Sequence, residues 1–356
     1  MSIKCAVVGL GHVGWTYSSA IGTIDGMELV AACDVFEKAR NVYRDKFPDV
    51  PIYQSVPELL ESVDFDAAFV LTSDPCHMEP FIQCLDAGKH VFVEKPVANK
   101  IDDIVEMVLA IDKHPELVAA SGHILRYYPV NQKIKQMAVE GEFGDIFYME
   151  GDYIHNLLYQ ASPEKFNESL GRNWYTEDEK PMVGGGCHPF DVLAWVADSP
   201  VVSVSSMGNH IAFPAMKHED CIVSIFKFES GAVAKVTALY GPVAPYAAFN
   251  NIAIYGTKAS VWRDQVCFDH EEGWKPLEYQ TYAEKFSHGF EREIIDFANA
   301  IRTGQPVIAP ARDCAQSEIA TLIATDALNS GKELTIPQLT RYIHHASLLD
   351  GSKYKS

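Results

Sequence analysis

Lys95 stands where a cation can act on a bound ligand. It follows the apolar run His90–Val93 in the order Glu94-Lys95-Pro96. Proline fixes the turn and disfavours helical dihedrals at the residue before it, so the ammonium group is expected to project from the end of a strand. A fixed cation there can lower the pKa of a hydroxyl and stabilise a developing alkoxide. The alternative is an ordinary solvated lysine in a surface loop.

His188 is the second candidate, because it lies in the opening turn of a predicted helix that follows the glycines at 184–186. An imidazole can take a proton from an alcohol near neutral pH. Asp191 lies three residues on, so it shares a helix face with His188 and could orient it or bind a hydroxyl. Equally, Asp191 could be a solvated carboxylate favoured by the helix dipole. Cys187 is not expected to pair with His188, since adjacent helical residues point about 100° apart.

Near the N-terminus an apolar run ends in three glycines with the spacing G-x-G-x-x-G: Gly9, Gly11 and Gly14. This pattern, between a strand and a helix, is typical of a dinucleotide-binding turn. Gly9 would permit the turn, Gly11 would let the main chain approach a pyrophosphate, and Gly14 would allow close helix packing. Main-chain N–H groups at the helix start, around His12 and Val13, would bind the phosphates.

A second apolar run, Met27–Cys33, ends at Asp34, twenty positions after Gly14. A carboxylate at this distance accepts hydrogen bonds from an adenosine ribose. It also repels a 2′-phosphate, so the sequence favours NAD, with NADP less favoured. Lys38 and Arg40 follow closely and weaken that preference.

The hydrophobic pattern predicts two domains. Up to about residue 120, apolar strands and amphipathic helices alternate, which is typical of an α/β Rossmann domain with a doubly wound parallel sheet. Beyond it, β-like runs with period two follow one another with few helices between them, which predicts an α+β domain with a large, mostly antiparallel sheet. We therefore expect a cofactor-binding domain over residues 1–122 and a substrate-binding and oligomerisation domain over residues 123–356.

Composition limits the kinds of partner and site that we expect. The 356 residues carry a formal charge of −19, which argues against a nucleic-acid partner because phosphate contacts need clustered Lys and Arg. The eight cysteines include no C-x-x-C pair, so we expect neither disulfides nor a metal site. No apolar run reaches membrane-spanning length and the first strand begins at once, so a membrane partner is not expected and the cytoplasm is the expected location.

Together these motifs resemble the Gfo/Idh/MocA oxidoreductases, the family of glucose-fructose oxidoreductase and inositol 2-dehydrogenase. The resemblance covers nearly the whole chain, and its most specific part is Ala87-Gly88-Lys89-His90-Val91 leading to Glu94-Lys95-Pro96. It implies that Lys95 is the catalytic lysine at the nicotinamide and His188 the general acid/base. It further implies a cofactor site lined by Thr72, Ser73, His77, Glu94 and Lys95, with Arg126 facing the active site.

The chain departs from the family pattern at Gly184. Many members carry an Asp there, four residues before the catalytic His. The departure removes one proton-handling partner, so either another residue replaces it or the chemistry differs.

Three further residues are candidate substrate contacts. Tyr153 and His155 would share one face of their strand by period two, and Trp174 precedes the glycine run. Aromatic rings beside hydrogen-bonding groups suit a carbohydrate, although ordinary packing explains each of them nearly as well.

The main hypothesis is an NAD-dependent oxidoreductase that transfers hydride between a secondary alcohol of a sugar or cyclitol and the nicotinamide. One alternative is a redox-neutral glycoside hydrolase or lyase that recycles tightly bound NAD. Another is a non-catalytic NAD-binding sensor or partner subunit. The large sheet would expose a broad face, so we expect a homodimer or homotetramer.

Overall fold

The computed structural model describes residues 2–161, 173–242, 251–281 and 289–344. The chain divides into two compact units. The first contains the described parts of Met1–Tyr127 and Ala283–Ala315, and the second contains the described parts of Tyr128–Tyr282 and Gln316–His345. The assignment of cofactor and substrate domains to residues 1–122 and 123–356 stays a prediction.

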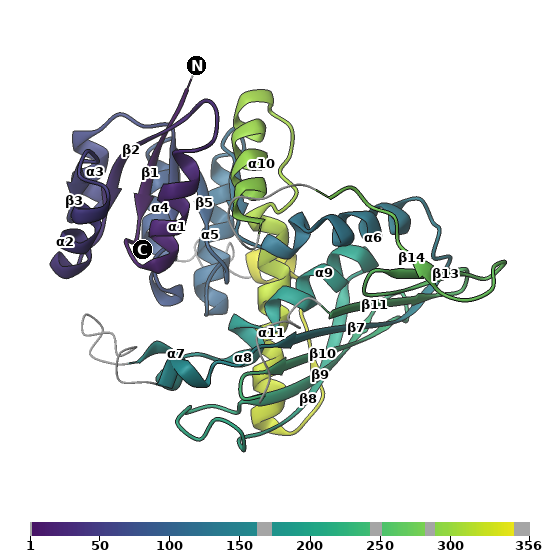
Figure 1. Cartoon of the computed structure of the whole chain (residues 1–356). Helices are drawn as coiled ribbons and strands as arrows, with labels where there is room; N and C mark the ends of the chain where they lie inside the picture. The colour runs from purple at the N-terminus through teal and green to yellow at the C-terminus, as the bar shows by residue number, and fades with distance from the viewer. Residues whose placement is uncertain (1, 162–172, 243–250, 282–288, 345–356) are drawn as a thin grey trace. The chain divides into compact units, whose positions relative to one another are not determined.

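The first unit is built on a six-stranded parallel sheet, as the sequence predicts. Strands and helices alternate along the chain from its first strand onward (Figure 1). In spatial order the strands are β3 (Ile52–Tyr53), β2 (Met27–Cys33), β1 (Ile3–Val8), β4 (Ala67–Val70), β5 (His90–Val93) and β6 (Ala119–Ser121). The order reverses at β1, so the carboxyl ends of β1 and β4 form the switch point where open parallel sheets bind ligands.

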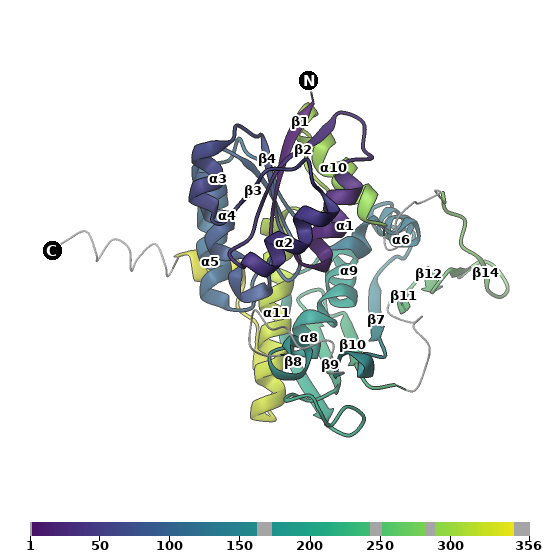
Figure 2. The same cartoon turned by 60° about the vertical axis from the view of Figure 1, so that its left-hand side comes forward.

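Helices cover both faces of this sheet. Figure 2 shows α3 (Val56–Ser62), α4 (Met78–Asp86) and α5 (Ile101–Lys113) on one side, and α1 (His12–Ile21) and α10 (Phe290–Thr303) on the other. The connection from β2 to β3 is α2 (Glu37–Lys46), and short 3-10 turns η1 (Asp74–Cys76) and η2 (Ile124–Tyr127) follow β4 and β6.

Local sequence explains where α3 begins. The Ser55 hydroxyl accepts a hydrogen bond from the Glu58 main-chain N–H at 3.3 Å, and the Glu58 carboxylate accepts one from the Gln54 N–H at 3.0 Å. This is a variant of the capping box in which the Glu58 carboxylate reaches the residue before the N-cap Ser55, and it satisfies the Glu58 N–H left free at the helix start.

The core of the first unit depends on α10, although that helix lies far along the chain. The ring of Phe297 lies 5.5 Å from Phe69 and 5.9 Å from Phe92, on the adjacent interior strands β4 and β5. The buried Tyr17 hydroxyl of α1 donates a hydrogen bond to the Glu293 carboxylate of α10. Burial raises the pKa of Glu293 well above its ordinary value.

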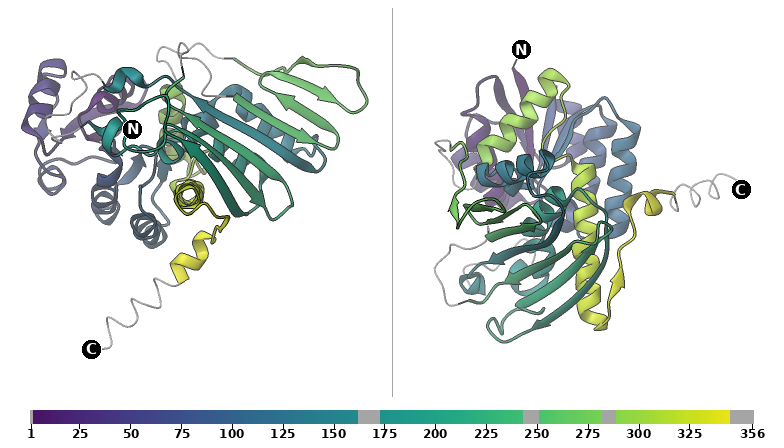
Figure 3. Two further views of the ribbon diagram at one scale, coloured as in Figure 1. Left: turned by 90° about the horizontal axis from the view of Figure 1, so that it is seen from below. Right: turned by 90° about the vertical axis from the view of Figure 1, so that its right-hand side faces the viewer.

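The second unit contains a nine-stranded sheet whose strands form one broad layer (Figure 3). Its spatial order is β14 (Lys275–Pro276), β13 (Gln265–Phe268), β12 (Ala259–Trp262), β11 (Asn251–Gly256), β7 (Ile146–Ile154), β10 (Val233–Leu239), β9 (Cys221–Phe228), β8 (Val201–Asn209) and β15 (Leu334–Thr335). The pairs are antiparallel except β7 with β10, which confirms the predicted mostly antiparallel sheet.

One face of this sheet is covered by α9 (Cys187–Ala197). Gly151 of β7 makes the close packing possible, because a Cβ there would lie 2.7 Å from Cβ of Pro189 and 3.2 Å from Leu193. The remaining helical elements are α6 (Pro129–Val139), α7 (Trp174–Glu177), α8 (Pro181–Gly184), η3 (Leu158–Ala161) and α11 (Ala311–Ser330). Within the described ranges, no helix is both long enough and apolar enough to cross a bilayer.

The placement of α10 can be tested by comparing two side chains of that helix. Because Phe297 is fully buried, Phe297→Ala should destabilise the protein by about 3–5 kcal/mol, seen as a lower melting temperature. Ile295, which is 42% exposed, provides the control, and Ile295→Ala should change the melting temperature little. Equal effects of the two substitutions would contradict the packing of α10 on β4 and β5.

Candidate functional site

The glycine turn after β1 is shaped for close approach of main-chain groups. Gly9 has φ of +100°, and a Cβ there would lie 2.6 Å from the main chain of Leu71 and Thr72 after β4. A Cβ on Gly14 would lie 2.1 Å from the Gly9 carbonyl oxygen. Around Gly11, by contrast, a Cβ would meet nothing within 4 Å. The turn is therefore closed toward the protein and open at Gly11, where a pyrophosphate is expected.

Asp34 is brought to this turn from the end of β2. Its Oδ2 accepts a hydrogen bond from the Leu10 N–H at 2.8 Å, and its Oδ1 accepts one from the Phe36 N–H at 2.8 Å. The Arg40 guanidinium donates to the carbonyl oxygens of Asp34 and Val35 at 2.7 and 3.0 Å. Arg40 thus helps to hold the end of β2 in place. This is one of the two cations that, in the sequence, weaken the preference for NAD over NADP.

The loops after β4 and β5 are joined through His77. Its Nδ1 lies 2.8 Å from the Pro96 carbonyl oxygen, and its Nε2 lies 3.0 Å from that of Thr72. Burial lowers the pKa of the imidazole, against the opposing effect of these main-chain hydrogen bonds. His77 is fully buried and lies against a main-chain carbonyl of each loop, so it holds the two loops together. Ser73, beside Thr72, precedes η1 and is half-buried.

Glu94 and Lys95 follow β5 at the same edge. The Glu94 carboxylate accepts a hydrogen bond from the Lys95 N–H at 2.9 Å. It lies against Gly122, where a Cβ would be 2.1 Å from Glu94 Oε2. Burial raises the pKa of Glu94, while the Lys95 charge lowers it. The Lys95 side chain is half-buried, and the Lys95–Pro96 peptide bond is cis.

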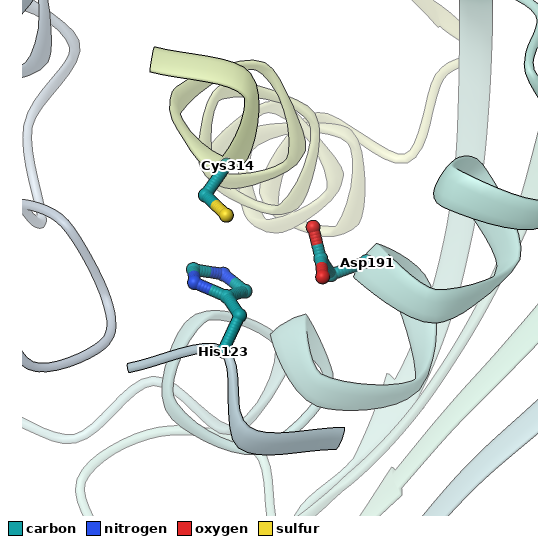
Figure 4. Close-up of side chains that lie close together, drawn as sticks. All are labelled: His123, Asp191 and Cys314. Carbon is teal, nitrogen blue, oxygen red and sulfur yellow. The ribbon is translucent and has the colours of Figure 1, made fainter. Parts of the chain in front are cut away.

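The segment after β6 places Arg126 and His123 in the first unit. Arg126 is only 4% exposed, and its guanidinium donates to the Ile308 carbonyl oxygen at 3.3 Å. The His123 ring points toward the Cys314 thiol at the start of α11, with the two groups within 4.8 Å (Figure 4). The expected role of Arg126 in substrate binding stays a prediction, since the contact seen is with main chain.

In the second unit, the predicted histidine lies at the start of α9. The ring of His188 is stacked on Tyr153 of β7, with centroids 5.6 Å apart and an angle of 12° between planes. The Tyr153 hydroxyl and His155 Nδ1 lie 2.9 Å apart, so these two side chains share a face as the period of the strand predicts. Tyr153, His155 and His188 therefore form one cluster, in which each ring is half-buried.

Asp191 is buried on α9, with 1% of its surface exposed. Its Oδ1 accepts a hydrogen bond from the Ser317 hydroxyl of α11 at 2.8 Å. This burial excludes the alternative of a solvated first-turn carboxylate. Trp174 begins α7, and its side chain lies outside the described part of the structure.

Sequence reasoning missed Glu179, which lies between α7 and α8. The side chain is buried, and Oε1 accepts a hydrogen bond from the Tyr240 hydroxyl at 2.5 Å. A Cβ on Gly184 would lie 1.8 Å from Oε1 of Glu179. The available signal was the glycine itself, since a residue without a side chain leaves room for the close approach of another group.

The first unit thus fits a dinucleotide, and two alanine substitutions in the turn can test this. Gly11→Ala should leave the melting temperature unchanged, because its Cβ meets no protein atom, but should weaken dinucleotide binding about tenfold or more. Gly14→Ala should lower the melting temperature as well, because its Cβ collides with the Gly9 carbonyl. Calorimetric titration and thermal unfolding measure the two effects; unchanged affinity in Gly11→Ala would contradict the predicted pyrophosphate position.

Comparison with known proteins agrees with this geometry. The chain matches the family model described as "Oxidoreductase family, NAD-binding Rossmann fold" over residues 3–121, and the "GFO/IDH/MocA C-terminal domain" over residues 131–262. It is 24% identical over 345 residues to scyllo-inositol 2-dehydrogenase (NAD(+)) of Bacillus subtilis (strain 168), covering 92% of this chain and 95% of that protein. It is also 24% identical over 346 residues to myo-inositol 2-dehydrogenase of Thermotoga maritima, covering 93% and 97%.

Solved structures show the same fold. Scyllo-inositol dehydrogenase from Lactobacillus casei, with bound NAD(H) and scyllo-inositol, superimposes with a TM-score of 0.80 at 23% identity, covering 94% of this chain and 99% of that chain. The two family models together span most of the described residues of both units. The chain therefore belongs to the GFO/IDH/MocA family of oxidoreductases, and its first part is the family's NAD-binding Rossmann fold.

Proposed function

We propose that the protein is an NAD-dependent dehydrogenase that oxidises a secondary alcohol of a sugar or cyclitol to a ketone, or runs the reverse reduction. The observation that carries the proposal is the position of Lys95. It follows β5 at the carboxyl edge of the parallel sheet, and His77 ties its loop to the loop after β4. The loop after β4 in turn lies against Gly9 of the glycine turn. The dinucleotide turn and the Lys95 cation therefore lie at the same edge of the parallel sheet.

Each residue has a defined task in this proposal. When bound, NAD supplies the acceptor for the hydride that leaves the carbinol carbon. Lys95 stabilises the negative charge that develops on the hydroxyl oxygen, and His188 accepts the hydroxyl proton. Asp34 binds the adenosine ribose, while the N–H groups around His12 and Val13 bind the phosphates. Thr72, Ser73 and Glu94 complete the cofactor side, and Arg126 and Asp191 are assigned to the substrate.

The substrate class follows from two kinds of support. Relatives that match over nearly their whole length carry the names scyllo-inositol and myo-inositol 2-dehydrogenase. In this chain, Tyr153 of β7 and His155, just after the end of β7, present a ring and hydrogen-bonding groups side by side, which suits the C–H faces and hydroxyls of a cyclic polyol. We assign the same role to Trp174.

Replacing Lys95 tests the mechanism. Incubation of the wild-type protein with NAD and a panel of cyclic polyols and sugars should produce NADH, measured by absorbance. Lys95→Ala should lower kcat by about 10²–10³-fold, because it removes a fixed positive charge at the reacting oxygen. The exposed Lys113 of α5 provides a matched control, and Lys113→Ala should retain full activity.

Two results would overturn this proposal. Full turnover in Lys95→Ala would remove the role assigned to that residue. Cleavage of a glycoside by the wild-type protein, without net NADH, would instead indicate a reaction in which NAD is recycled.

We also propose that the protein forms a homodimer or homotetramer through the face of the nine-stranded sheet opposite α9. Met207 on β8 and Ile225 on β9 point to that face and are 83% and 43% exposed. Trp262 on β12 is 42% exposed. Lys235 of β10 forms ion pairs on this face with Glu150 and Asp152 of β7, at 3.2 and 3.3 Å. Large apolar side chains exposed together on one sheet face are typical of an interface between subunits.

Charge substitutions on this face test the assembly. The double variant Met207→Asp/Ile225→Asp should elute as a monomer at micromolar concentration, because four carboxylates would face one another across a two-fold interface. Val139→Asp, at an apolar residue of α6 that is 73% exposed, should leave the assembly unchanged. Light scattering after size exclusion measures the mass; a monomeric wild-type protein would contradict the proposal.

A further inference from the structure

A carboxylate occupies the space that a side chain at position 184 would need. An ideal Cβ on Gly184 would lie 1.8 Å from Oε1, 2.7 Å from Oε2 and 2.5 Å from the carboxyl carbon of Glu179. Glu179 is 6% exposed, so this contact is part of the buried structure of the second unit. Only glycine at position 184 therefore leaves room for the Glu179 carboxylate. The two residues must occur together for this packing to form.

Glu179 is connected to His188 through a series of contacts. The Tyr240 hydroxyl donates a hydrogen bond to Glu179 Oε1, and the Tyr240 ring lies 5.9 Å from that of Tyr153. Tyr153 is in turn stacked on His188. Gly185 allows the two tyrosines to approach, because a Cβ there would lie 2.6 Å from the ring of Tyr153 and 2.8 Å from that of Tyr240.

The backbone makes a second connection. The His188 N–H donates a hydrogen bond to the Gly185 carbonyl oxygen at 3.2 Å, so the first turn of α9 is built on the residue next to Gly184. The buried acid, the glycines and the histidine are thus parts of one packed arrangement.

We propose that Glu179 is the positioning acid for His188: its carboxylate, held over Gly184 by Tyr240, stabilises the protonated imidazole and orders Tyr153 against the ring. This inference rests on the proposed function, because it gives His188 the role of proton acceptor. In this proposal Glu179 supplies the negative charge that many family members place at position 184 as Asp, and that Gly184 lacks.

The physical basis is electrostatic. A buried carboxylate interacts more strongly with a nearby imidazolium than a solvated one, because little water screens it. When His188 accepts the hydroxyl proton, a fixed negative charge in the same packed cluster favours the product of that step. The effect raises the pKa of His188 and makes it a stronger base. Tyr153 is the titratable group stacked on His188, and His155 and Tyr240 in turn contact Tyr153. Cys187 and Asp191 lie on the same helix as His188.

The first test measures the His188 pKa directly in the protein without cofactor. NMR titration of the imidazole, assigned with His188→Asn, should show a pKa lower by about 1 unit in Glu179→Gln than in the wild type. The amide keeps the shape of the side chain and removes its charge. Glu177→Gln removes an exposed acid two residues away and should leave the His188 pKa unchanged, because solvent screens that charge.

The second test moves the carboxylate to the other side of the contact. Because a Cβ at 184 points into the space of the Glu179 carboxyl group, Glu179→Ala/Gly184→Asp should return the His188 pKa toward the wild-type value. Glu179→Ala/Gly184→Ala adds the same Cβ without charge and should remain at the lowered value. This pair separates the effect of charge from that of packing.

The kinetic test follows the acidic limb of the pH profile of kcat/KM. Oxidation requires neutral His188, so the rate rises with pH through its pKa, and removal of the Glu179 charge should move the limb about 1 pH unit lower. If wild-type enzyme turns over and Glu179→Gln titrates like it in both measurements, the inference is wrong while the proposed function stands. If the wild type reduces no NAD with any polyol, the proposed function fails, yet the NMR titration still decides whether Glu179 sets the His188 pKa.

Discussion

The structure depends on glycines whose missing side chains leave room for functional groups. At Gly14 the space is filled by the Gly9 carbonyl, at Gly122 by the Glu94 carboxylate and at Gly184 by the Glu179 carboxylate, with distances of 2.1, 2.1 and 1.8 Å to an ideal Cβ. Interiors are packed too densely for such a group to move aside without cost, so a Cβ at any of these points would displace it. The dinucleotide turn, the loop that carries Lys95 and the cluster around His188 each rest on one such approach.

The two carboxylates share a second property, which is that donors from the protein hold them. Burial of a charge is costly unless it is hydrogen-bonded, and Glu94 receives the Lys95 N–H while Glu179 receives the Tyr240 hydroxyl. The positions of the Glu94 and Glu179 carboxylates are therefore set by local packing and hydrogen bonds, and not by the net charge of the chain. The same holds for the expected phosphate site, because a chain with a formal charge of −19 must bind an anion through local N–H groups.

Long-range packing completes the first unit. The aromatic ring of Phe297 lies against Phe69 and Phe92 of two adjacent interior strands, and the Glu293 carboxylate accepts a hydrogen bond from the Tyr17 hydroxyl. The edge that carries Lys95 is thus supported by a helix that follows most of the second unit in the sequence. The apolar stripe of α10 predicts a helix, but such a stripe contains no information about which sheet it covers.

The sequence alone determined the features that depend on neighbouring residues: the parallel and antiparallel sheets, from hydrophobic period, and the dinucleotide turn with Asp34, from glycine spacing. It also placed His188 at a helix start and Tyr153 with His155 on one strand face. Only the tertiary structure decided that Asp191 is buried against Ser317, that His77 joins two loops and that Glu179 fills the space over Gly184. These contacts join segments that are separated along the chain or linked by irregular turns. The hydrophobic periodicity of each segment contains no information about which side chains meet there.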